Sequence, residues 1–262
     1  FTSEDYGEIT RTSGIAQDRT GVLYAGNQDV VLAFDGQAWR SIRTGTGPNV
    51  VLATDTRDRI WVGGLAGFGR LDDDGRGGRV FRSFREAIPA GDQTFGVFLN
   101  IAATTHGVYF IAEHAMVRVQ DDAVSVLRGR RGVGGAGDTI LAVDERGVLQ
   151  GFDGRDWRDV ADFPELRRTF VTSVQREQDG AWLLCLRGDG LWRLRNGQPT
   201  RLTTDIDSLL REACDHQIAL LRDGTMVVAS WSGPIAFLGP DGRLLHWLES
   251  DAVGRPLARA RG

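Results

Sequence analysis

The sequence predicts an all-β protein, a β-propeller of four-stranded antiparallel blades, and three observations lead to this prediction. Asp-Gly or Asn-Gly turn signals recur along the whole chain. Polar turns followed by short apolar runs alternate with them, and helical periodicity is nearly absent. Strands of about 4–7 residues between turns, in a repeat of about 40 residues, are typical of propeller blades.

The turn signals keep a regular register. They end at Gly36, Gly75, Gly154, Gly197 and Gly242, and Asp121-Asp122 takes the same role between the second and third of them, so the intervals are 39, 47, 32, 43 and 45 residues. Such dipeptides favour the positive φ angles of a tight hairpin, and each therefore marks a joint between two antiparallel strands. The phrases FDGQAWRSI and FDGRDWRDV, which begin at residues 34 and 152, are then outer hairpins of two blades that lie three repeats apart.

The apolar runs supply the inner strands of each repeat. They appear in QDRTGVLYAGN, TDTRDRIWVGG, TTHGVYFIAE, REQDGAWLLCL and LRDGTMVVASW. The spacing from Asp18 to Tyr24 equals the spacing from Asp55 to Trp61. The first unit predicts strands over 14–17, 22–25, 30–34 and 38–42, and the fifth over 171–175, 181–186, 190–194 and 200–203. Only the segments 82–87 and 206–214 are expected to hold a helical turn.

Six blades are legible in a single propeller domain spanning 1–262. We place them at 14–44, 49–84, 98–128, 132–161, 170–204 and 215–249. The fourth is irregular, because the Gly-rich RRGVGGAGDT must supply its innermost strand and glycine is a poor strand former. We expect the chain to be a piece of a longer protein whose ring has seven blades; the alternative is a six-bladed ring closed by residues 1–11.

Tryptophan and cysteine positions extend this assignment. Fourth strands carry Trp39, Trp157 and Trp247, second strands carry Trp61 and Trp182, and a third strand carries Trp192; all six are predicted to fill space between blades. Trp231 follows the strand MVVAS and is predicted to lie near a loop. Cys185 and Cys214 are predicted to be two buried free thiols, although an oxidising compartment would permit a bridge.

Charge and hydropathy argue against a nucleic-acid-binding protein and against a membrane-spanning segment in this sequence. The net charge of −4 argues against nucleic-acid binding, and the exclusive use of Arg among the basic residues is interpreted as a genomic bias. No apolar run approaches the ~20 residues that span a bilayer. No basic and apolar leader precedes the first repeat.

No catalytic, metal or cofactor site is predicted. The histidines, His106, His114, His216 and His246, lie on different blades and outside any metal-ligand spacing. Propeller loops can nevertheless converge at the axis, so a metal-dependent propeller lyase or lactonase remains an alternative. GRRGVGGAGD lacks the Gly-Lys-Ser/Thr ending of a phosphate loop, and no nucleophile elbow is present.

Four stretches resemble the two-component-regulator propeller sensors of bacteria. They are YGEITRTSGIAQDRTGVLYAGNQDVVLAFDGQAWRSI, DRIWVGGLAGFGRLDDDG, GVYFIAEH and LRDGTMVVASWSGPIAFLGPDGRLLHWLE. The shared pattern is D-x-x-G-x-h-W/Y-h-G, in which h is an apolar residue. Trp61 keeps the aromatic position of this pattern, whereas Leu141 and Met226 replace it in later units. The resemblance covers about residues 1–250.

The resemblance implies a non-enzymatic periplasmic ligand-sensing domain of a signal-transduction receptor. In that family the propeller precedes a triple-Tyr β-sandwich, a transmembrane helix and a cytoplasmic output domain. The implied partners are a small-molecule or carbohydrate ligand and the downstream triple-Tyr domain, with a homodimer as a further candidate and no nucleic acid. The alternatives are a protein-binding propeller scaffold and the metal-dependent enzyme named above.

The candidate ligand site follows from the loops that share one face of a propeller. The second-to-third-strand loops offer Asn27, Gln28, Phe68, His114, Arg187 and Trp231, and the connections between blades offer Phe95, Asn100, Arg131 and Arg168. Aromatic rings beside Asn, Gln and Arg suit sugar rings or carboxylated sugars, through stacking and planar hydrogen bonds. Trp231 and Arg187, from adjacent blades, are predicted to flank one pocket.

Overall fold

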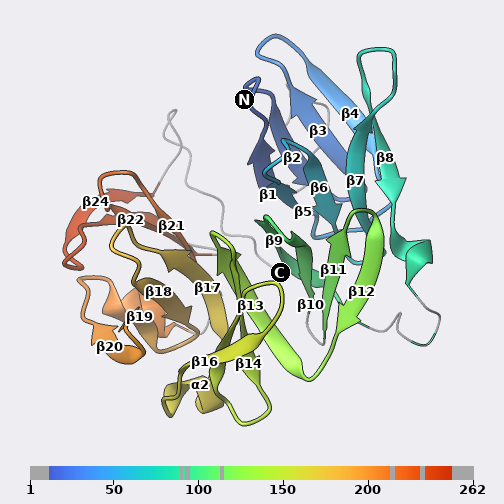
Figure 1. The fold of residues 1–262 in the computed structure, drawn as a ribbon. Coiled ribbons are helices and arrows are strands. Elements are labelled where there is room, and N and C mark those ends of the chain that lie inside the picture. The colour runs from blue at the N-terminus through green and yellow to red at the C-terminus, as the bar shows by residue number, and fades with distance from the viewer. Residues whose placement is uncertain are drawn as a thin grey trace. The chain divides into compact units, whose positions relative to one another are not determined.

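The computed structural model describes residues 12–88, 91, 95–112, 115–212, 216–230 and 234–249. Within them it contains 24 strands in six four-stranded sheets, and in every sheet the strands lie side by side in chain order (Figure 1). These sheets are the six four-stranded antiparallel blades of a β-propeller, here numbered 1 to 6 along the chain. The predicted fold class is confirmed. The predictions for residues 1–11 and for the chain after residue 249 lie outside the described residues.

The chain divides into two compact units, 1–140 and 141–262, and the division falls within one strand of blade 4. The first unit contains β1 (Thr12–Gln17), β2 (Leu23–Asn27), β3 (Val30–Phe34), β4 (Trp39–Arg43), β5 (Val51–Thr54), β6 (Ile60–Gly63), β7 (Phe68–Asp73), β8 (Arg79–Ser83), β9 (Phe98–Thr104), β10 (Gly107–Ala112), β11 (Met116–Gln120), β12 (Ala123–Leu127) and β13 (Arg130–Ala136). β14 (Thr139–Asp144) spans the division. The second unit continues with β15 (Leu149–Phe152), β16 (Trp157–Ala161), β17 (Val171–Arg176), β18 (Trp182–Leu186), β19 (Gly190–Arg195), β20 (Gln198–Leu202), β21 (His216–Leu220), β22 (Met226–Ser230), β23 (Ile235–Leu238) and β24 (Leu244–Leu248).

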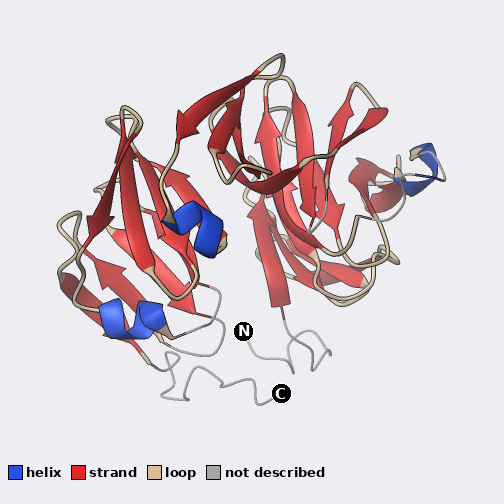
Figure 2. Cartoon of the chain, turned by 90° about the horizontal axis from the view of Figure 1, so that it is seen from below, coloured by secondary structure: helices blue, strands red, loops and turns tan. Residues whose placement is uncertain are grey.

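Helices are short and lie between blades. Figure 2 shows how little of the described chain they occupy. The 3-10 helix η1 (Arg85–Ala87) and the helix α3 (Asp207–Arg211) fall in the two segments that were expected to hold a helical turn, whereas α2 (Glu165–Arg168) was not predicted. None of the helices in the described ranges is long and apolar enough to cross a bilayer.

An aspartate holds the polar turn between the first and second strands of blade 2. The Asp55 carboxylate accepts hydrogen bonds from the backbone N–H groups of Arg57 and Arg59, both at 2.9 Å. It also accepts the Nε–H of Arg59 at 2.7 Å and the indole N–H of Trp61 at 2.8 Å. One buried carboxylate therefore closes the hairpin and fixes the large side chain six residues later.

The same device recurs in other blades, which explains the repeated six-residue spacing. In blade 1, Asp18 accepts the N–H groups of Thr20 and Val22 at 3.0 Å and the hydroxyl of Tyr24, also at 3.0 Å. In blade 4, Asp144 accepts two backbone N–H groups at the corresponding positions. The aspartate of the repeat is thus a structural cap, consistent with the tendency of Asp to bond the backbone two residues ahead.

The phrase that occurs twice in the sequence forms the same hairpin in blades 1 and 4. Phe34 lies directly opposite Trp39, with ring centroids 4.8 Å apart, and Phe152 lies opposite Trp157 at 4.9 Å. Asp35 and Asp153 each accept the N–H groups two and three residues ahead. The third and fourth strands of a blade are therefore joined by one cross-strand aromatic pair and one capped turn.

The prediction that six Trp residues fill space between blades is correct only in part. Trp61 and Trp182 are buried, but the other four remain half-buried. Trp39 and Trp157 pair with a Phe of their own hairpin, as described above. Trp192 packs 5.2 Å from Phe163, and Trp247 packs against a buried cluster of blades 5 and 6.

The turn at Gly154 depends on glycine, because its φ is +97°. The substitution Gly154→Val should reduce the free energy of unfolding by about 1–3 kcal/mol, since a β-branched residue at positive φ is strained. Gly154→Asn, which tolerates positive φ better, should lose less. Urea unfolding of the three proteins measures both differences, and an unchanged midpoint for the valine variant would contradict this account of the turn.

The glycines of β13 have a packing role that the sequence analysis did not find. A Cβ atom at Gly132 would lie 2.7 Å from Cγ2 of Ile111, and one at Gly135 would lie 2.9 Å from Cβ of Ala102. The inner strand of blade 4 therefore approaches β9 and β10 too closely for larger residues. The Gly-rich segment therefore does form a strand, β13, and glycine occupies the positions where a Cβ atom would clash with β9 or β10.

The two units have different cores. In the first, Trp61, Phe68, Phe84, Phe98 and Phe110 belong to one buried cluster in which several ring pairs meet edge to face or tilted, such as Phe68 and Phe98 at 5.4 Å. In the second, one buried cluster is mainly aliphatic and joins blades 5 and 6 through β18, β19, β22, β23 and α3. Cys185 is buried in this cluster, and Cys214 lies outside the described residues, so the prediction of two free thiols stays a prediction.

Candidate functional site

One exposed aromatic ring and one arginine meet where β17 begins and β18 ends in the second unit. Phe170 is 51% exposed, and the guanidinium of Arg187 lies over its ring, 5.4 Å from the centroid. The N–H of Arg187 donates to the carbonyl of Phe170 at 2.9 Å, and the hydroxyl of Thr169 donates to the carbonyl of Arg187 at 2.6 Å. We call these three residues, with the preceding Arg168, the Phe170 platform.

Local structure holds this platform in place. α2 begins after Pro164, which suits the first turn of a helix, and its Leu166 is buried. The N–H of Thr169 donates to Glu165, which ends the helix and leads directly into the platform. Because backbone hydrogen bonds join α2, β17 and β18 at this point, the exposed ring is supported by regular structure. A ligand would find the surface already formed.

The platform contains two of the predicted site residues, Arg168 and Arg187. Both residues are exposed, and Phe170, which was not predicted, stacks with Arg187 and lies two residues after Arg168. In the sequence, Phe170 reads as the first apolar residue of a strand, and no local pattern separates it from a core residue. Its position two residues after the predicted Arg168 is the one signal that could have identified it. Trp231, the predicted partner of Arg187, lies outside the described residues, as does His114.

In the first unit, hydrogen bonds join the turns after β2 and β6 to the connection between β4 and β5, and together they form a second loop surface, here called the braced surface. The connection between β4 and β5 is tied to Asp29, whose carboxylate accepts the N–H of Gly47 at 2.8 Å. The N–H of Ala66 donates to Thr46 at 2.7 Å, and the N–H of Leu65 donates to Pro48 at 3.2 Å. The turns after β2 and β6 are therefore locked to the inter-blade connection.

The predicted residues of the first unit do not converge into one site. Gln28 is exposed at this braced surface, in the turn after β2, with a φ of +45°, whereas the neighbouring Asn27 is completely buried. Asn100 is half-buried in β9, and its side-chain oxygen accepts the N–H of Ile101 at 2.8 Å. Arg131 lies half-buried in β13, where burial lowers the pKa of its guanidinium.

Phe68 and Phe95 require a correction, because both belong to the core and not to a surface loop. Phe68 is the first residue of β7 and is completely buried against Phe98 and Phe110. Phe95 is 5% exposed and stacks on Phe98 at 4.9 Å. Turn signals located these residues beside loops correctly, but they do not show that the rings turn inward to fill the space between blades 2 and 3.

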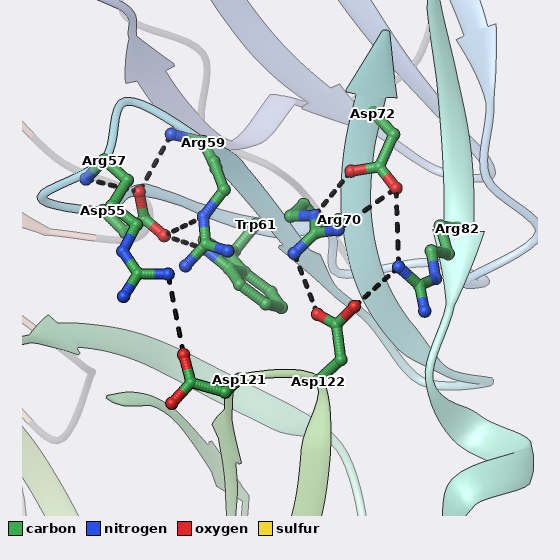
Figure 3. A network of polar contacts seen from close by, with 9 residues as sticks. All are labelled: Asp55, Arg57, Arg59, Trp61, Arg70, Asp72, Arg82, Asp121 and Asp122. Atoms are coloured by element: carbon green, nitrogen blue, oxygen red, sulfur yellow. Dashed lines mark hydrogen bonds and ion pairs between the residues drawn. The ribbon is translucent and has the colours of Figure 1, made fainter. Parts of the chain in front are cut away.

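An ion-pair network joins blades 2 and 3 in the first unit (Figure 3). Arg70 of β7 pairs with Asp72 at 2.5 Å and with Asp122 at 3.0 Å, and its guanidinium lies 5.4 Å from the centroid of the Trp61 ring. Arg82 of β8 also pairs with Asp122, at 2.7 Å. Asp122 lies in the turn between β11 and β12 at a φ of +64°, so this turn connects the outer strands of one blade to the next. The network is a structural clamp.

Carboxylates in the caps and in the clamp should make stability fall in acid. Burial would raise the pKa of Asp55, but hydrogen bonds from Trp61 and Arg59 outweigh it and leave that pKa below the usual 3.8. Hydrogen bonds and nearby arginines likewise outweigh burial at Asp122, and hydrogen bonds do so at Asp18, so the pKa of each carboxyl is also lowered. A carboxyl whose pKa is lower in the folded than in the unfolded protein stabilises the fold above pH 3.8, where it is ionised in both states. This stabilisation is lost as the pH falls through the folded-state pKa.

The melting temperature should therefore change little between pH 7 and pH 5 and decrease steadily below about pH 4. Thermal unfolding followed by circular dichroism in constant salt measures this dependence. The variant Asp122→Asn should show a weaker acid dependence than the parent protein, because one of the responsible groups is gone. A melting temperature that rises between pH 5 and pH 3 would contradict the assignment.

The histidines in the described residues are hydrogen-bonded, buried or packed against a ring of the fold. Nδ1 of His106 lies 2.7 Å from the hydroxyl of Tyr109, and Nε2 lies 2.8 Å from the carbonyl of Asp138. Burial raises the pKa of Tyr109 to about 12, so its hydroxyl keeps a proton to donate. His216 is buried, and His246 packs 5.7 Å from Phe237. Over the described ranges, no three His, Cys, Asp or Glu side chains come close enough together to hold a metal ion.

Comparisons with known proteins identify the fold but no family. No protein-family model matches the chain, and no curated protein matches its sequence. Solved structures do match. A catalytically inactive virginiamycin B lyase from Staphylococcus aureus, in a structure with quinupristin, superposes with a TM-score of 0.71 at 13% identity, over 95% of this chain and 86% of that chain.

Extracellular sensor domains are also among the similar structures. The extracellular domain of a protein assigned to the hybrid two-component systems of B. thetaiotaomicron matches with a TM-score of 0.68 at 12% identity, over 95% of this chain but only 36% of that chain. An extracellular domain assigned to a one-component system of the same organism matches at 0.54 and 13% identity, over 84% and 37% of the two chains. At these identities the likeness shows the fold alone: the chain is a β-propeller of the kind found both in a lyase and in extracellular domains of bacterial sensor systems.

Proposed function

We propose that this chain is a non-enzymatic ligand-sensing domain of a bacterial receptor, located in the periplasm, which binds a small molecule or an oligosaccharide and relays a conformational signal to a downstream output domain. The observation that carries the proposal is the Phe170 platform, an exposed and pre-formed stacking surface on a propeller. Support comes from the fold, which is shared with extracellular domains of two-component systems. The four sequence stretches that resemble regulator propellers point in the same direction.

The chemistry of the platform suits a saccharide. The apolar face of a pyranose ring stacks on an aromatic side chain, and the 51% exposure of Phe170 leaves such a face accessible. The guanidinium of Arg187, which lies over one face of this ring, presents planar donors beside the exposed part of it. Hydroxyl or carboxylate oxygens of a bound sugar would accept from them, and Arg168 adds positive charge at the same end of β17.

A route for the signal follows from the same contacts. The platform joins the end of β18 to the start of β17 through the Arg187–Phe170 and Thr169–Arg187 hydrogen bonds. A ligand that stacks on Phe170 and bonds Arg187 would contact both strand ends, and its binding would favour the receptor state in which they are joined in this way. The receiving partner would be the downstream triple-Tyr domain of the same polypeptide, and a homodimer is a further way to pass the signal on.

A binding screen with single variants tests the ligand site. A panel of neutral and acidic oligosaccharides is titrated into the wild-type chain, and the melting temperature is followed. We expect at least one oligosaccharide to raise it, and Phe170→Ala and Arg187→Ala to weaken that binding by at least about tenfold, which corresponds to ~1.4 kcal/mol. The controls are Leu245→Ala, an apolar residue that is 62% exposed, and Arg222→Ala, an exposed arginine elsewhere in the unit. Equal binding by the platform variants would contradict the proposal.

The likeness to virginiamycin B lyase makes a lyase the second candidate function. Quinupristin, present in that structure, is the probe that separates the two. It is incubated with the purified chain, with and without added divalent metal, and its chromatographic retention is followed. We expect no change; conversion to a new species in the presence of metal would favour the enzyme over the sensor.

A further inference from the structure

A groove of about 460 Å3 lies over the outer hairpin of blade 5, away from the Phe170 platform. Its walls are formed by Arg193, Arg195, Asn196, Gln198, Thr200 and Leu202, together with Arg201, all from β19, β20 and the turn between them. The Phe170 platform lies before the start of β19, and the hairpin turn follows its end. The six residues of β19 place the turn about 20 Å from the platform, whereas Leu202, opposite Leu191, lines the end of the groove nearer to it.

Two cross-strand pairs place the polar side chains of the groove on one face of the hairpin. Arg193 lies directly opposite Thr200, and Arg195 lies directly opposite Gln198. Residues directly opposite in an antiparallel pair share a face, and so do residues two apart on one strand. The groove therefore presents two guanidinium groups, a hydroxyl and an amide within about 7 Å of one another along the strands.

The first of these arginines is held in a fixed position. Its Nε and Nη2 donate to the two carboxylate oxygens of Glu177, both at 2.7 Å, and Nη2 also donates to the carbonyl of Pro240 at 3.0 Å. Glu177 is only 16% exposed and does not line the groove. The acid orients Arg193 from behind, while Nη1 of Arg193 has no partner among the described residues. A bound group would meet a cation that is already positioned.

The remaining polar groups are available to a ligand. Arg195 forms its ion pair with Asp179, in which both side chains are more than half exposed. The side chains of Asn196, Gln198 and Thr200 make no hydrogen bond to any described part of the chain, and all three residues are exposed. No carboxylate lines the groove. Glu177 and Asp179 contact Arg193 and Arg195 from outside these walls, so a ligand carboxylate would share the two guanidinium groups with them. The neutral polar groups have no such competitor.

We infer that this groove is a second binding site, which takes a saccharide that carries a carboxylate group. Arginine forks form strong charge-assisted hydrogen bonds with carboxylates, and amide and hydroxyl groups match the hydroxyls of a sugar. The volume falls within the range of about 300–1,000 Å3 that small-molecule sites occupy. The groove binds such a saccharide independently of whether the Phe170 platform senses a ligand.

The experiment uses trigalacturonate as the probe and isothermal titration calorimetry as the measurement. The neutral trisaccharide maltotriose and a short poly-glutamate peptide are the comparison ligands. We expect trigalacturonate to bind and maltotriose to bind at least about tenfold more weakly. Absence of trigalacturonate binding at millimolar concentration overturns the proposal. Equal binding of maltotriose overturns the role of the carboxylate, and tighter binding of poly-glutamate overturns the saccharide class.

Variants locate the binding. Arg195→Gln should weaken trigalacturonate binding about tenfold and Gln198→Ala about threefold, and both change exposed side chains that the fold does not need. Arg193→Gln should also weaken it, with folding checked by circular dichroism because Glu177 loses its partner. Arg222→Gln and Leu245→Ala, exposed side chains outside both the groove and the Phe170 platform, are the controls and should bind trigalacturonate like the wild type. Unchanged binding by Arg195→Gln and Gln198→Ala, or equal losses in the two controls, would overturn the assignment to this groove.

Discussion

Replacing Asp55 with alanine should lower the free energy of unfolding by about 3–5 kcal/mol. The substitution removes the acceptor of two backbone N–H groups, of the Arg59 guanidinium and of the Trp61 indole at once. Hydrogen bonds to charged groups contribute roughly 1.5–3 kcal/mol each, and a buried donor left without a partner costs about 1–3 kcal/mol. The Trp61 indole is 1% exposed, so water cannot easily replace the carboxylate. Chemical denaturation measures the loss.

Asp74 provides a matched control for this substitution. Its carboxylate accepts the backbone N–H groups two and four residues ahead, those of Arg76 and Gly78, both at 2.8 Å. These are the same two cap bonds that Asp55 makes, but the turn is exposed and no side-chain donor is involved. Asp74→Ala should therefore lose much less stability than Asp55→Ala. Equal losses would show that the buried indole and guanidinium contribute nothing.

Arg70→Ala is expected to have the second large effect, a loss of about 1.5–3 kcal/mol, the range for hydrogen bonds to charged groups. The Arg70 side chain is 10% exposed and is paired with both Asp72 and Asp122. These carboxylates are 31% and 38% exposed and Arg82 still contacts them, so solvent and Arg82 keep the loss below that of a fully buried pair. The clamp between blades 2 and 3 would also open at the turn after β11.

Arg57, which contacts Asp121 in the same turn, serves as the control. Arg57 lies 3.6 Å from Asp121, and the two side chains are 66% and 71% exposed. Exposed ion pairs contribute about 0–1 kcal/mol, so Arg57→Ala should leave the unfolding midpoint nearly unchanged. The two substitutions compare a buried and an exposed contact to adjacent residues (Figure 3). A larger loss for Arg57→Ala than for Arg70→Ala would contradict the view of Arg70 as the centre of the clamp.

The fold was predictable because its signals are local. Turn residues with special backbone angles mark each hairpin, and Gly36, Gly154 and Gly242 adopt φ angles of +96°, +97° and +89°. The six-residue spacing of the caps is likewise a local property of one hairpin. What the sequence could not show is which way a ring turns at the end of a strand. Phe68 and Phe170 occupy similar places beside loops, yet one is completely buried and the other is half exposed.

The candidate site was predictable only at its charged residues. Arg187 was identified from its loop, but its stacking partner Phe170 comes from the connection before another strand, 17 residues earlier in the chain. The groove over β19 and β20 was missed because its arginines read as ordinary outer-strand residues. Only the register of Arg193 with Thr200 and of Arg195 with Gln198 brings them to one face. The residue spacing within one strand does not show which residue of the next strand lies opposite.

The transcriptional response of cells that carry the full-length receptor tests the central claim, that the Phe170 platform senses a ligand, most directly. Cells with wild-type, Phe170→Ala, Arg187→Ala or Leu245→Ala receptor are challenged with each member of the oligosaccharide panel, and receptor levels are matched by immunoblot. We predict that at least one oligosaccharide induces the wild-type and Leu245→Ala receptors and that both platform variants fail to respond to it. A response of the two platform variants equal to that of the wild type would contradict the claim.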